Sequence, residues 1–393
     1  MRTHAIDLLR SLVGFDTTSA KPNRPLIDFI AARLRDEGVD SSLVGNEDGS
    51  KASLLATVGP ALTGGIVLSG HTDVVPVTGQ DWTSDPFRLS ERDGRLYGRG
   101  TADMKSFLAV ALAMVPAFRA RRLRVPIHLA FSYDEEVGCL AAPALIAQMQ
   151  RDLPTPALAI IGEPTEMALA NAHRGISTFV TTVTGRAGHA GAPWKGINAI
   201  ATAAECITYL NRLAAERGGA TSEGANGKMP TTINVGTIAG GEAVNIIAEH
   251  CHFAWECRPA AGDDAEDVRA RLQAWAETAL LPAMRQRAPA AAIISETKVA
   301  VPPLNPQPGF DVEESDPGRT ALAIALGLAG RDACTTVPFA SEAGLFQRAG
   351  IPAFVCGPGS VLQAHQPDEF VTVEQIDACI RFMTRVAAWA EQG

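Results

Sequence analysis

The sequence predicts an α/β protein with a mainly parallel sheet, helices on both of its faces, and a second domain inserted into the chain. Apolar strand-like runs alternate with helix-like segments up to about residue 175, which is typical of crossover units on a parallel sheet. From Ile176 the expected order changes to β-α-β-β-α-β. The 393 residues also exceed the size at which one core usually stops growing, so two domains are expected.

The first domain is predicted from strong local signals. Its expected elements, in chain order, are a helix at 25–37, a strand at 66–69, a helix at 106–121, a strand at 127–132, a helix from Ala141 and a strand at 157–161. Histidine and acidic residues that could bind a metal ion occur both before the insertion and near the C-terminus. We therefore expect residues 1–175 and 301–393 to form one domain.

The inserted segment, residues 176–300, is expected to form a compact ferredoxin-like unit. Its expected elements are a strand at 176–184, a helix at 197–217, strands at 231–238 and 245–257, a helix from 264 to about 285, and a strand at 291–299. A Gly/Ala/Ser-rich loop is expected around Gly218 to Gly227, and the proline-rich segment 302–306 is typical of a return linker.

Composition narrows the class of protein. A net charge of -9 disfavours nucleic acid or an anionic membrane as a partner, because both require a basic surface. The N-terminal residues lack the apolar core of a signal peptide, and no apolar run is long enough to span a bilayer. Seven cysteines without Cys-x-x-Cys spacing indicate reduced thiols. These features predict a cytoplasmic protein.

Histidine and acidic residues recur in an order that is typical of a metal site. Most follow or close an apolar run, and side chains at the carboxyl ends of parallel strands meet at one edge of a sheet. Imidazoles and carboxylates together suit zinc, cobalt or manganese. The candidates are His71 and Asp73 after the run 65–70, Asp103 in the segment 98–105, the pair Glu135-Glu136, Glu163 after Gly162, and His365.

Each candidate taken alone has a simpler interpretation. Glu135-Glu136 would be a solvated charge pair, a single histidine would be an ordinary polar side chain, and Asp103 would cap a helix that starts near Ser106. Their joint occurrence in this order favours a metal site. The segment 98–105 lacks the glycines of a dinucleotide turn or a phosphate-binding loop. Strand alternation also places His250 and His252 on the opposite face from Cys251, which argues against a zinc cluster there.

The ordered motifs resemble the metallopeptidase family that contains acetylornithine deacetylase, succinyl-diaminopimelate desuccinylase, aminoacylases and glutamate-type carboxypeptidases. The resemblance runs from Leu12-Val13-Gly14-Phe15-Asp16-Thr17-Thr18 to His365-Gln366-Pro367-Asp368-Glu369-Phe370. It implies two divalent ions, with zinc expected and cobalt as an alternative. One ion would be held by His71 and Glu163, and the other by Glu136 and His365. Asp103 would bridge them, Glu135 would be the general base, and Asp73 would support His71.

These roles are chemically consistent. Amide hydrolysis needs an activated water and a polarised carbonyl, which a metal pair supplies. A carboxylate suits the bridging position because an imidazole presents one lone pair to one ion at a time. Glu135 can transfer the proton of the water to the leaving amine. Asp73 is expected to accept the second N–H of His71 and thereby fix its tautomer.

The insert contains further candidates. The glycine-rich turn 185–191 presents His189, and in the family such a histidine reaches the active site of the partner subunit to stabilise the oxyanion. Asn245 and Arg258 resemble the substrate-binding pair of the family, since the planar guanidinium of arginine binds both oxygens of a carboxylate. A turn histidine without function and a surface ion pair between Arg258 and Glu256 are the alternatives. The resemblance implies a homodimer formed through the insert.

The segments 340–346 and 356–360 resemble the acetylornithine deacetylase branch, although Ala340-Ser341 replace the more usual glycine and threonine, and Cys257 is unusual before the arginine. Glu342 would bind the side-chain ammonium of an N-acetylated diamino acid. The implied reaction removes acetate from N2-acetyl-L-ornithine to give L-ornithine. Another N-acyl-amino-acid amidohydrolase (a desuccinylase or an aminoacylase), a dipeptidase and a catalytically inactive amino-acid-binding relative are the alternatives. The presence of Glu135 with five ligands argues against the last.

Overall fold

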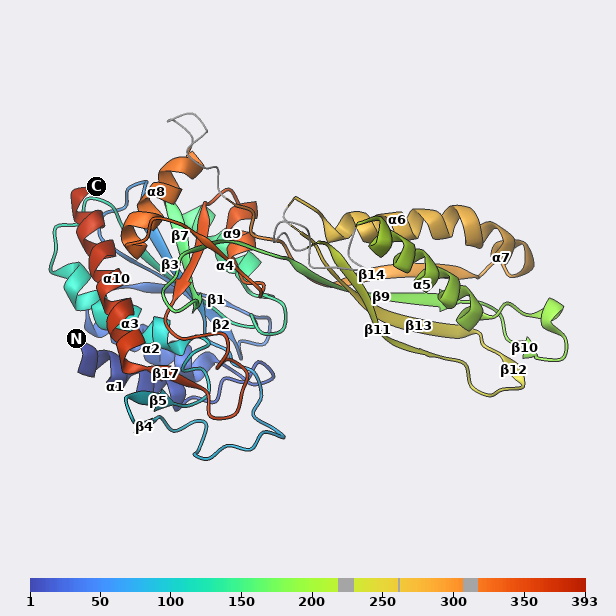
Figure 1. Ribbon diagram of the computed structural model, residues 1–393, viewed down its shortest axis with the longest axis horizontal. Helices are drawn as coiled ribbons and strands as arrows, with labels where there is room; N and C mark the ends of the chain where they lie inside the picture. Colours follow the sequence, from blue (N-terminus) through green and yellow to red (C-terminus); the bar gives the residue numbers. More distant parts are fainter. Residues whose placement is uncertain (218–229, 261, 307–316) are drawn as a thin grey trace. The chain divides into compact units, whose positions relative to one another are not determined.

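The computed structural model describes residues 1–217, 230–260, 262–306 and 317–393, so the expected loop around Gly218 to Gly227 lies outside the described residues. The chain divides into two compact units. The first unit contains Met1–His173 and Leu304–Gly393, and the insert is Arg174–Pro303. Figure 1 shows both units.

The first unit contains an eight-stranded sheet in the order β1-β2-β6-β3-β7-β16-β8-β15. Its middle strands β6, β3, β7 and β16 are parallel to one another. Near one edge of the sheet, β2 runs antiparallel to both of its neighbours, β1 and β6. Every residue of β3, β6 and β7 is buried, as expected for strands that helices cover on both faces. The strands are β1 (Ser41–Gly45), β2 (Ala52–Val58), β3 (Ile66–His71), β6 (Ile127–Ser132), β7 (Leu158–Pro164), β8 (Ala170–His173), β15 (Thr335–Val337) and β16 (Ala353–Gly357).

Two apolar cores lie on the two faces of this sheet. The larger core contains apolar residues of α1, α2, α3, α8 and α10, and the smaller core contains those of α4 and α9. This arrangement of helices on both faces was predicted from the sequence and is confirmed. The helices are α1 (Arg2–Val13), α2 (Arg24–Asp36), α3 (Lys105–Arg119), α4 (Ala142–Asp152), α8 (Pro317–Ala329), α9 (Ala343–Arg348) and α10 (Val373–Gln392).

A separate three-stranded sheet, β17-β5-β4, was not predicted. Its strands are β4 (Ser90–Arg92), β5 (Arg95–Tyr97) and β17 (Phe370–Thr372), and Phe370 pairs with Tyr97. This pairing brings the segment after β5, which carries Asp103, beside the segment before β17, which carries His365. Asp103 therefore comes from a loop that leads into α3, and not from a strand of the main sheet.

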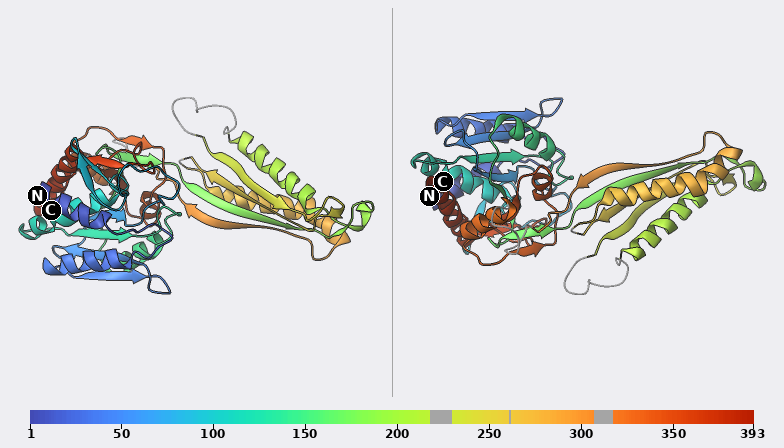
Figure 2. Two further views of the ribbon diagram at one scale, coloured as in Figure 1. Left: turned by 90° about the horizontal axis from the view of Figure 1, so that it is seen from below. Right: turned by 90° about the horizontal axis from the view of Figure 1, so that it is seen from above.

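The insert is a four-stranded antiparallel sheet in the order β11-β13-β9-β14. Two views of it show α5 and α6 on the same face (Figure 2). Residues of α5, α6 and α7 form one core with buried residues of the sheet such as Phe179, Phe253 and Trp255. The elements are β9 (Ile176–Thr184), α5 (Ala199–Glu216), β11 (Thr232–Gly240), β13 (His250–Arg258), α6 (Ala265–Trp275), α7 (Leu281–Arg287) and β14 (Ala292–Val301).

Two expected elements of the insert are divided in the structure. The strand expected at 245–257 consists of β12 (Ile246–Ile247) and β13, because β12 leaves the main sheet to pair with β10 (Gly188–His189). The helix expected from 264 to about 285 consists of α6 and α7, with a π-helical segment, Ala276–Leu280, between them. This segment lies just before Pro282, which has no N–H for a regular helical hydrogen bond. Within the described residues, no helix has the length and apolar character needed to cross a membrane.

Candidate metal centre

The first unit brings all five expected ligands together. His71 is the last residue of β3, Glu163 lies in β7, and Glu136 lies in the turn that follows β6. Asp103 precedes α3, and His365 lies in the loop between β16 and β17. The parallel strands β6, β3 and β7 end at the same edge of the sheet, which explains why their side chains meet.

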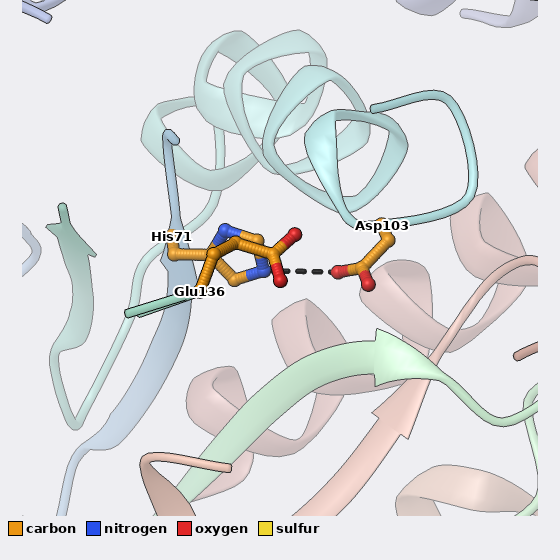
Figure 3. A group of neighbouring side chains, drawn as sticks. All are labelled: His71, Asp103 and Glu136. Carbon is orange, nitrogen blue, oxygen red and sulfur yellow. Dashed lines mark hydrogen bonds and ion pairs between the residues drawn. The ribbon is translucent and has the colours of Figure 1, made fainter. Parts of the chain in front are cut away.

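Asp103 lies between the two histidines. Its Oδ1 atom is 2.9 Å from Nε2 of His71, and its Oδ2 atom is 3.3 Å from Nε2 of His365. Glu163 Oε1 is 3.6 Å from His71 Nε2, and Glu136 Oε2 is 3.1 Å from His365 Nε2. Figure 3 shows His71 pointing toward Asp103 with Glu136 beside them. The geometry is therefore that of two histidine–carboxylate pairs joined by one shared carboxylate.

The position of Asp73 differs from the expectation. Its backbone carbonyl, 2.9 Å from His71 Nδ1, is the closest acceptor for the imidazole N–H, whereas its carboxylate Oδ1 is 3.5 Å away. The carboxylate instead accepts hydrogen bonds from Ser19 Oγ at 2.7 Å and from the backbone N–H groups of Glu135 and Glu136 at 3.2 and 3.3 Å. Asp73 thus fixes the turn that carries both glutamates, while its main chain orients His71.

Negative charge is crowded in this cluster. Burial, reinforced by the charge of Asp103, raises the pKa of Glu163 to about 8 and that of Glu136 to about 7. Burial and the charge of Glu163 also raise the pKa of Glu135 well above its ordinary value. The hydrogen bonds of His365 with Asp103 and Glu136 raise its pKa to about 10. The cluster therefore has a strong tendency to bind positive charge.

For His71 and Asp103, burial shifts the pKa in one direction and the neighbouring groups shift it in the other. Burial lowers the pKa of His71, but the charge of Glu163 and the hydrogen bond to Asp103 outweigh it and raise the pKa well above the ordinary value. Burial raises the pKa of Asp103, but the contacts with His365 and His71 outweigh burial and lower the pKa. Both shifts have the same cause, which is a need for cations among buried carboxylates.

The residues fit a pair of divalent ions. Neighbouring ligands of a tetrahedral zinc ion, each about 2.0–2.1 Å from the metal, lie about 3.3 Å apart, and the separations above bracket this value. Glu163 Oε1 is buried and accepts no hydrogen bond from the residues that the structure describes. The ligand atoms of His71, Asp103 and Glu136 lie within 4.8 Å of one another, as do those of His71, Glu135 and Glu163.

Glu135 lies beside this cluster without belonging to either histidine–carboxylate pair. Its Oε1 atom accepts a hydrogen bond from the thiol of Cys139 at 3.5 Å. Its side chain is half-buried, and its backbone is fixed by Asp73. A carboxylate held at the edge of a metal cluster has the position that a general base requires.

The insert separates its three candidates into two groups. His189 in β10 pairs with Ile246, the neighbour of Asn245, and both His189 and Asn245 are exposed. Arg258 ends β13 at the opposite end of the sheet, where its Nε atom is 3.1 Å from Glu256 Oε1. The length of β13 alone, from His250 to Arg258, is about 26 Å. His189 and Arg258 of one chain therefore cannot both contact the same N-acyl amino acid.

Glu342 does not occupy the position expected of a substrate-binding residue. It is 1% exposed and lies at the N-terminus of α9. Its carboxyl accepts hydrogen bonds from Ser132 Oγ and, at 3.4 Å, from Ser69 Oγ, which are on the two strands that lead to the metal ligands. A carboxyl enclosed in this way is not available to the ammonium group of a substrate, so the predicted contact between Glu342 and that ammonium is wrong.

Comparison with known proteins gives the family. Residues 67–389 match the model of peptidase family M20/M25/M40. The chain belongs to this family. It is 35% identical over 380 residues to an acetylornithine deacetylase of Pasteurella multocida (strain Pm70), a match that covers 96% of this chain and 94% of the relative.

Solved structures of other proteins share the fold of this M20/M25/M40 chain. Aminopeptidase PepT from Bacillus cereus ATCC 10987 has a TM-score of 0.73 and 20% identity, and the match covers 99% of both chains. The YXEP protein of Bacillus subtilis, described as a dinuclear metal-binding peptidase, has a TM-score of 0.66 and 15% identity, with 100% of this chain and 98% of that chain covered. These similarities confirm the α/β fold that was predicted.

Several residues that organise the site of this family member were not identified from the sequence. They are Ser19, which donates to Asp73, Cys139, which contacts Glu135, and Glu369, which accepts from the backbone N–H of Asp103. Ser19 and Glu369 lie next to or within the two segments that carry the resemblance. That location is the only sequence signal for these two residues, since neither residue type nor spacing predicts which group a side chain contacts.

Proposed function

We propose that this chain is a metal-dependent amidohydrolase that removes the acetyl group from N2-acetyl-L-ornithine. The observation that carries the proposal is Asp103, whose two oxygens face His71 and His365 in a chain closely related to acetylornithine deacetylases along almost its whole length. The cluster supports the reaction type, and the relatives support the choice of substrate.

The ligand set suits two zinc ions, with cobalt as an alternative, because imidazole nitrogens and carboxylate oxygens both bind these ions. His71 and Glu163 would hold one ion, Glu136 and His365 would hold the other, and Asp103 would contact both. Bound there, the ions would lower the pKa of a water molecule and polarise the amide carbonyl of the substrate.

The remaining steps belong to side chains of the protein. Glu135 takes the proton of the attacking water and delivers it to the leaving amine, which departs as the α-amino group of ornithine. Arg258 binds the α-carboxylate of the substrate through both oxygens, after its guanidinium exchanges Glu256 for the substrate. His189 donates a hydrogen bond to the oxyanion, and Asn245 beside it binds the substrate.

The geometry of the insert supports a shared active site. Because His189 and Arg258 of one chain are too far apart to contact one substrate, they serve two different active sites in this proposal. A homodimer in which each insert supplies His189 and Asn245 to the partner satisfies this requirement. We place the enzyme in the cytoplasm, since all seven cysteines are free thiols in the structure and six of them are buried.

A substrate panel with metal-depleted protein tests this function. After removal of metal with a chelator, the protein is assayed with N2-acetyl-L-ornithine, N-succinyl-diaminopimelate, N-acetyl-methionine and a dipeptide. We expect no activity until zinc or cobalt is added, and then the highest kcat/KM for acetylornithine. Full activity in protein that elemental analysis shows to be free of metal would contradict the metal site. A higher kcat/KM for another compound would contradict the choice of substrate.

A further inference from the structure

Glu369 is buried beside the metal centre, and no step of the proposed reaction uses it. Its side chain is fully enclosed together with that of Arg99. Four donors converge on its carboxylate. Oε1 accepts from the backbone N–H groups of Ala102 at 2.7 Å and Asp103 at 3.0 Å, and Oε2 accepts from Gly100 N–H at 2.9 Å and from Arg99 Nη1 at 2.7 Å. One carboxylate thus holds the backbone of the loop that presents Asp103.

Arg99 connects this carboxylate to the loop of His365. Its Nη1 group also donates to the carbonyl of Gln366 at 3.3 Å, and its Nη2 group donates to Oε1 of Gln80. The amide of Gln80 in turn donates to the carbonyl oxygen of His365 at 2.8 Å. The contacts of Glu369, Arg99 and Gln80, which we call the loop clamp, therefore reach the main chain of both Asp103 and His365.

The local backbone explains why a clamp is needed. Three of the four N–H groups in the segment 100–103 have their acceptor in Glu369, and buried donors without acceptors are costly. His365 has a φ of 64°, in the left-handed region that a residue other than glycine adopts at a cost. The neighbouring Gln80 contact holds this residue in place. Asp103 Oδ2 and His365 Nε2 are 3.3 Å apart. This separation thus depends on hydrogen bonds to the main chain of the two residues, and not on contacts of their side chains.

We propose that Glu369 is a positioning residue that sets the distance between Asp103 and His365 and thereby the affinity for the ion held by Glu136 and His365. The inference rests on the proposed function. Two of the three ligands of that ion, Asp103 and His365, are held by the loop clamp. At the other ion, which His71 and Glu163 hold, the clamp fixes Asp103 alone. Loss of Glu369 therefore weakens the two metal positions unequally.

Titration of metal-depleted protein with Co²⁺ tests this assignment. Calorimetry and the visible absorption of Co²⁺ are expected to resolve two binding steps in the wild-type protein. The variant His365→Ala identifies which step belongs to the Glu136 and His365 position. In Glu369→Gln, an amide replaces one of the two accepting oxygens and repels the N–H donors. We expect the identified step to weaken about 10-fold to 100-fold, as is usual when a group that supports a ligand is lost, and the other step to weaken less.

Two further variants make the test decisive. Glu391→Gln is the matched control, since Glu391 forms an ion pair with Arg121 at 2.7 Å on the partly exposed surface, and we expect both steps to stay at their wild-type affinity. Gln80→Ala keeps the buried ion pair of Arg99 and Glu369 intact, and we expect a smaller loss at the same step. This variant decides the question if Glu369→Gln does not fold, which circular dichroism will show.

Unchanged affinities in folded Glu369→Gln, or an equal loss at both steps, would overturn the inference. If only Gln80→Ala can be measured, an unchanged titration has the same consequence. Wild-type protein that binds no Co²⁺ would instead contradict the proposed function, and the inference with it. A wild-type protein with two steps and a variant with a selective loss supports both.

Discussion

At the scale of single residues, Glu135 is the side chain on which turnover depends most directly in the proposed reaction. It is adjacent to the ligand Glu136, yet it lies outside both histidine–carboxylate pairs and contacts Cys139 instead. In Glu135→Gln the size and the hydrogen-bonding capacity remain, but the side chain no longer accepts a proton. We expect kcat to fall by about 10²-fold to 10⁴-fold with the metal content unchanged.

Steady-state kinetics and elemental analysis measure both quantities on the same preparation. The exposed Glu166, in the turn that follows β7, provides a control, and Glu166→Gln should leave kcat unchanged. A metal-loaded Glu135→Gln protein with nearly normal turnover would exclude the role of general base.

Arg258 allows a second prediction at this scale. In the structure its guanidinium is paired with Glu256, so binding of a substrate carboxylate exchanges one carboxylate for another. Arg258→Ala should lower kcat/KM for acetylornithine about 10-fold to 100-fold, the usual effect of losing charge-assisted hydrogen bonds. The carboxamide analogue of the substrate should be nearly unaffected.

The variant Glu256→Gln completes this comparison. If Arg258 binds substrate, releasing it from Glu256 should not reduce kcat/KM. If the two residues form only a surface ion pair, Arg258→Ala should affect neither the acid nor the amide substrate.

The sequence predicted the residues of the cluster but not how they are held. Histidine and acidic residues carry their chemistry in their type, so His71, Asp103, Glu163 and His365 could be selected by order alone. The support of these ligands involves main-chain groups, such as the carbonyl of Asp73 and the N–H groups that Glu369 accepts. Every residue has these groups, and which of them meet is decided by the fold. For the same reason the burial of Glu342 could not be foreseen.

At the scale of elements, the strength of the local signal decided what could be predicted. Strands β3, β6 and β7 are continuous apolar runs that are fully buried, and each was predicted. Strands β4, β5 and β17 have three residues each, too few to show a period, and their pairing links segments that are far apart in sequence. This unpredicted sheet is what places the Asp103 loop beside the His365 loop.

The pairing of β6 with β2 leads to a prediction about stability. His128 of β6 lies opposite Thr57 of β2, and its Nδ1 atom is 2.9 Å from Thr57 Oγ1. Its Nε2 atom is buried without a hydrogen-bond partner among the described residues, and burial lowers its pKa from 6.5 to about 4. The unfolded chain therefore binds a proton between these pH values that the folded protein does not bind.

Since the folded pKa is the lower one, the stabilisation is present above pH 6.5 and is lost as the pH falls toward 4. The loss should amount to about 3 kcal/mol of unfolding free energy. Urea unfolding of wild type and His128→Leu from pH 7 to pH 4 measures it, because the difference between the two proteins isolates this histidine. His4→Gln, at an exposed histidine of α1, should follow the wild-type curve. Parallel curves for wild type and His128→Leu would contradict the prediction.

At the scale of the whole molecule, the order of elements fixes which end of the insert carries which residue. The two connections to the first unit, near Arg174 and Pro303, are at the end of the sheet that also holds Arg258, since Ser177 pairs with Cys257 and Ile176 with Val301. His189 and Asn245 lie at the opposite end. The sequence predicted the elements of the insert, but the separation of its candidate residues follows only from the register of β13.

This separation predicts how two inactive proteins should behave when they are mixed. In the proposed homodimer each active site combines Glu135 of one subunit with His189 of the other. Neither Glu135→Gln nor His189→Ala should be active alone, because removal of one oxyanion donor costs about 10² to 10³ in kcat and loss of the base costs at least as much. After subunit exchange, a mixed dimer has one site in which both residues are intact. We therefore expect activity in the mixture that approaches one quarter of the wild-type value, since about half of the dimers are mixed and each has one of two sites restored.

Mass spectrometry under native conditions establishes that exchange has occurred. A double variant, Glu135→Gln with His189→Ala, mixed with wild type serves as the reference, because each site of its mixed dimers has lost one of the two residues and these dimers should be inactive. If exchange is complete and activity does not return, His189 acts within its own subunit or has no part in the reaction.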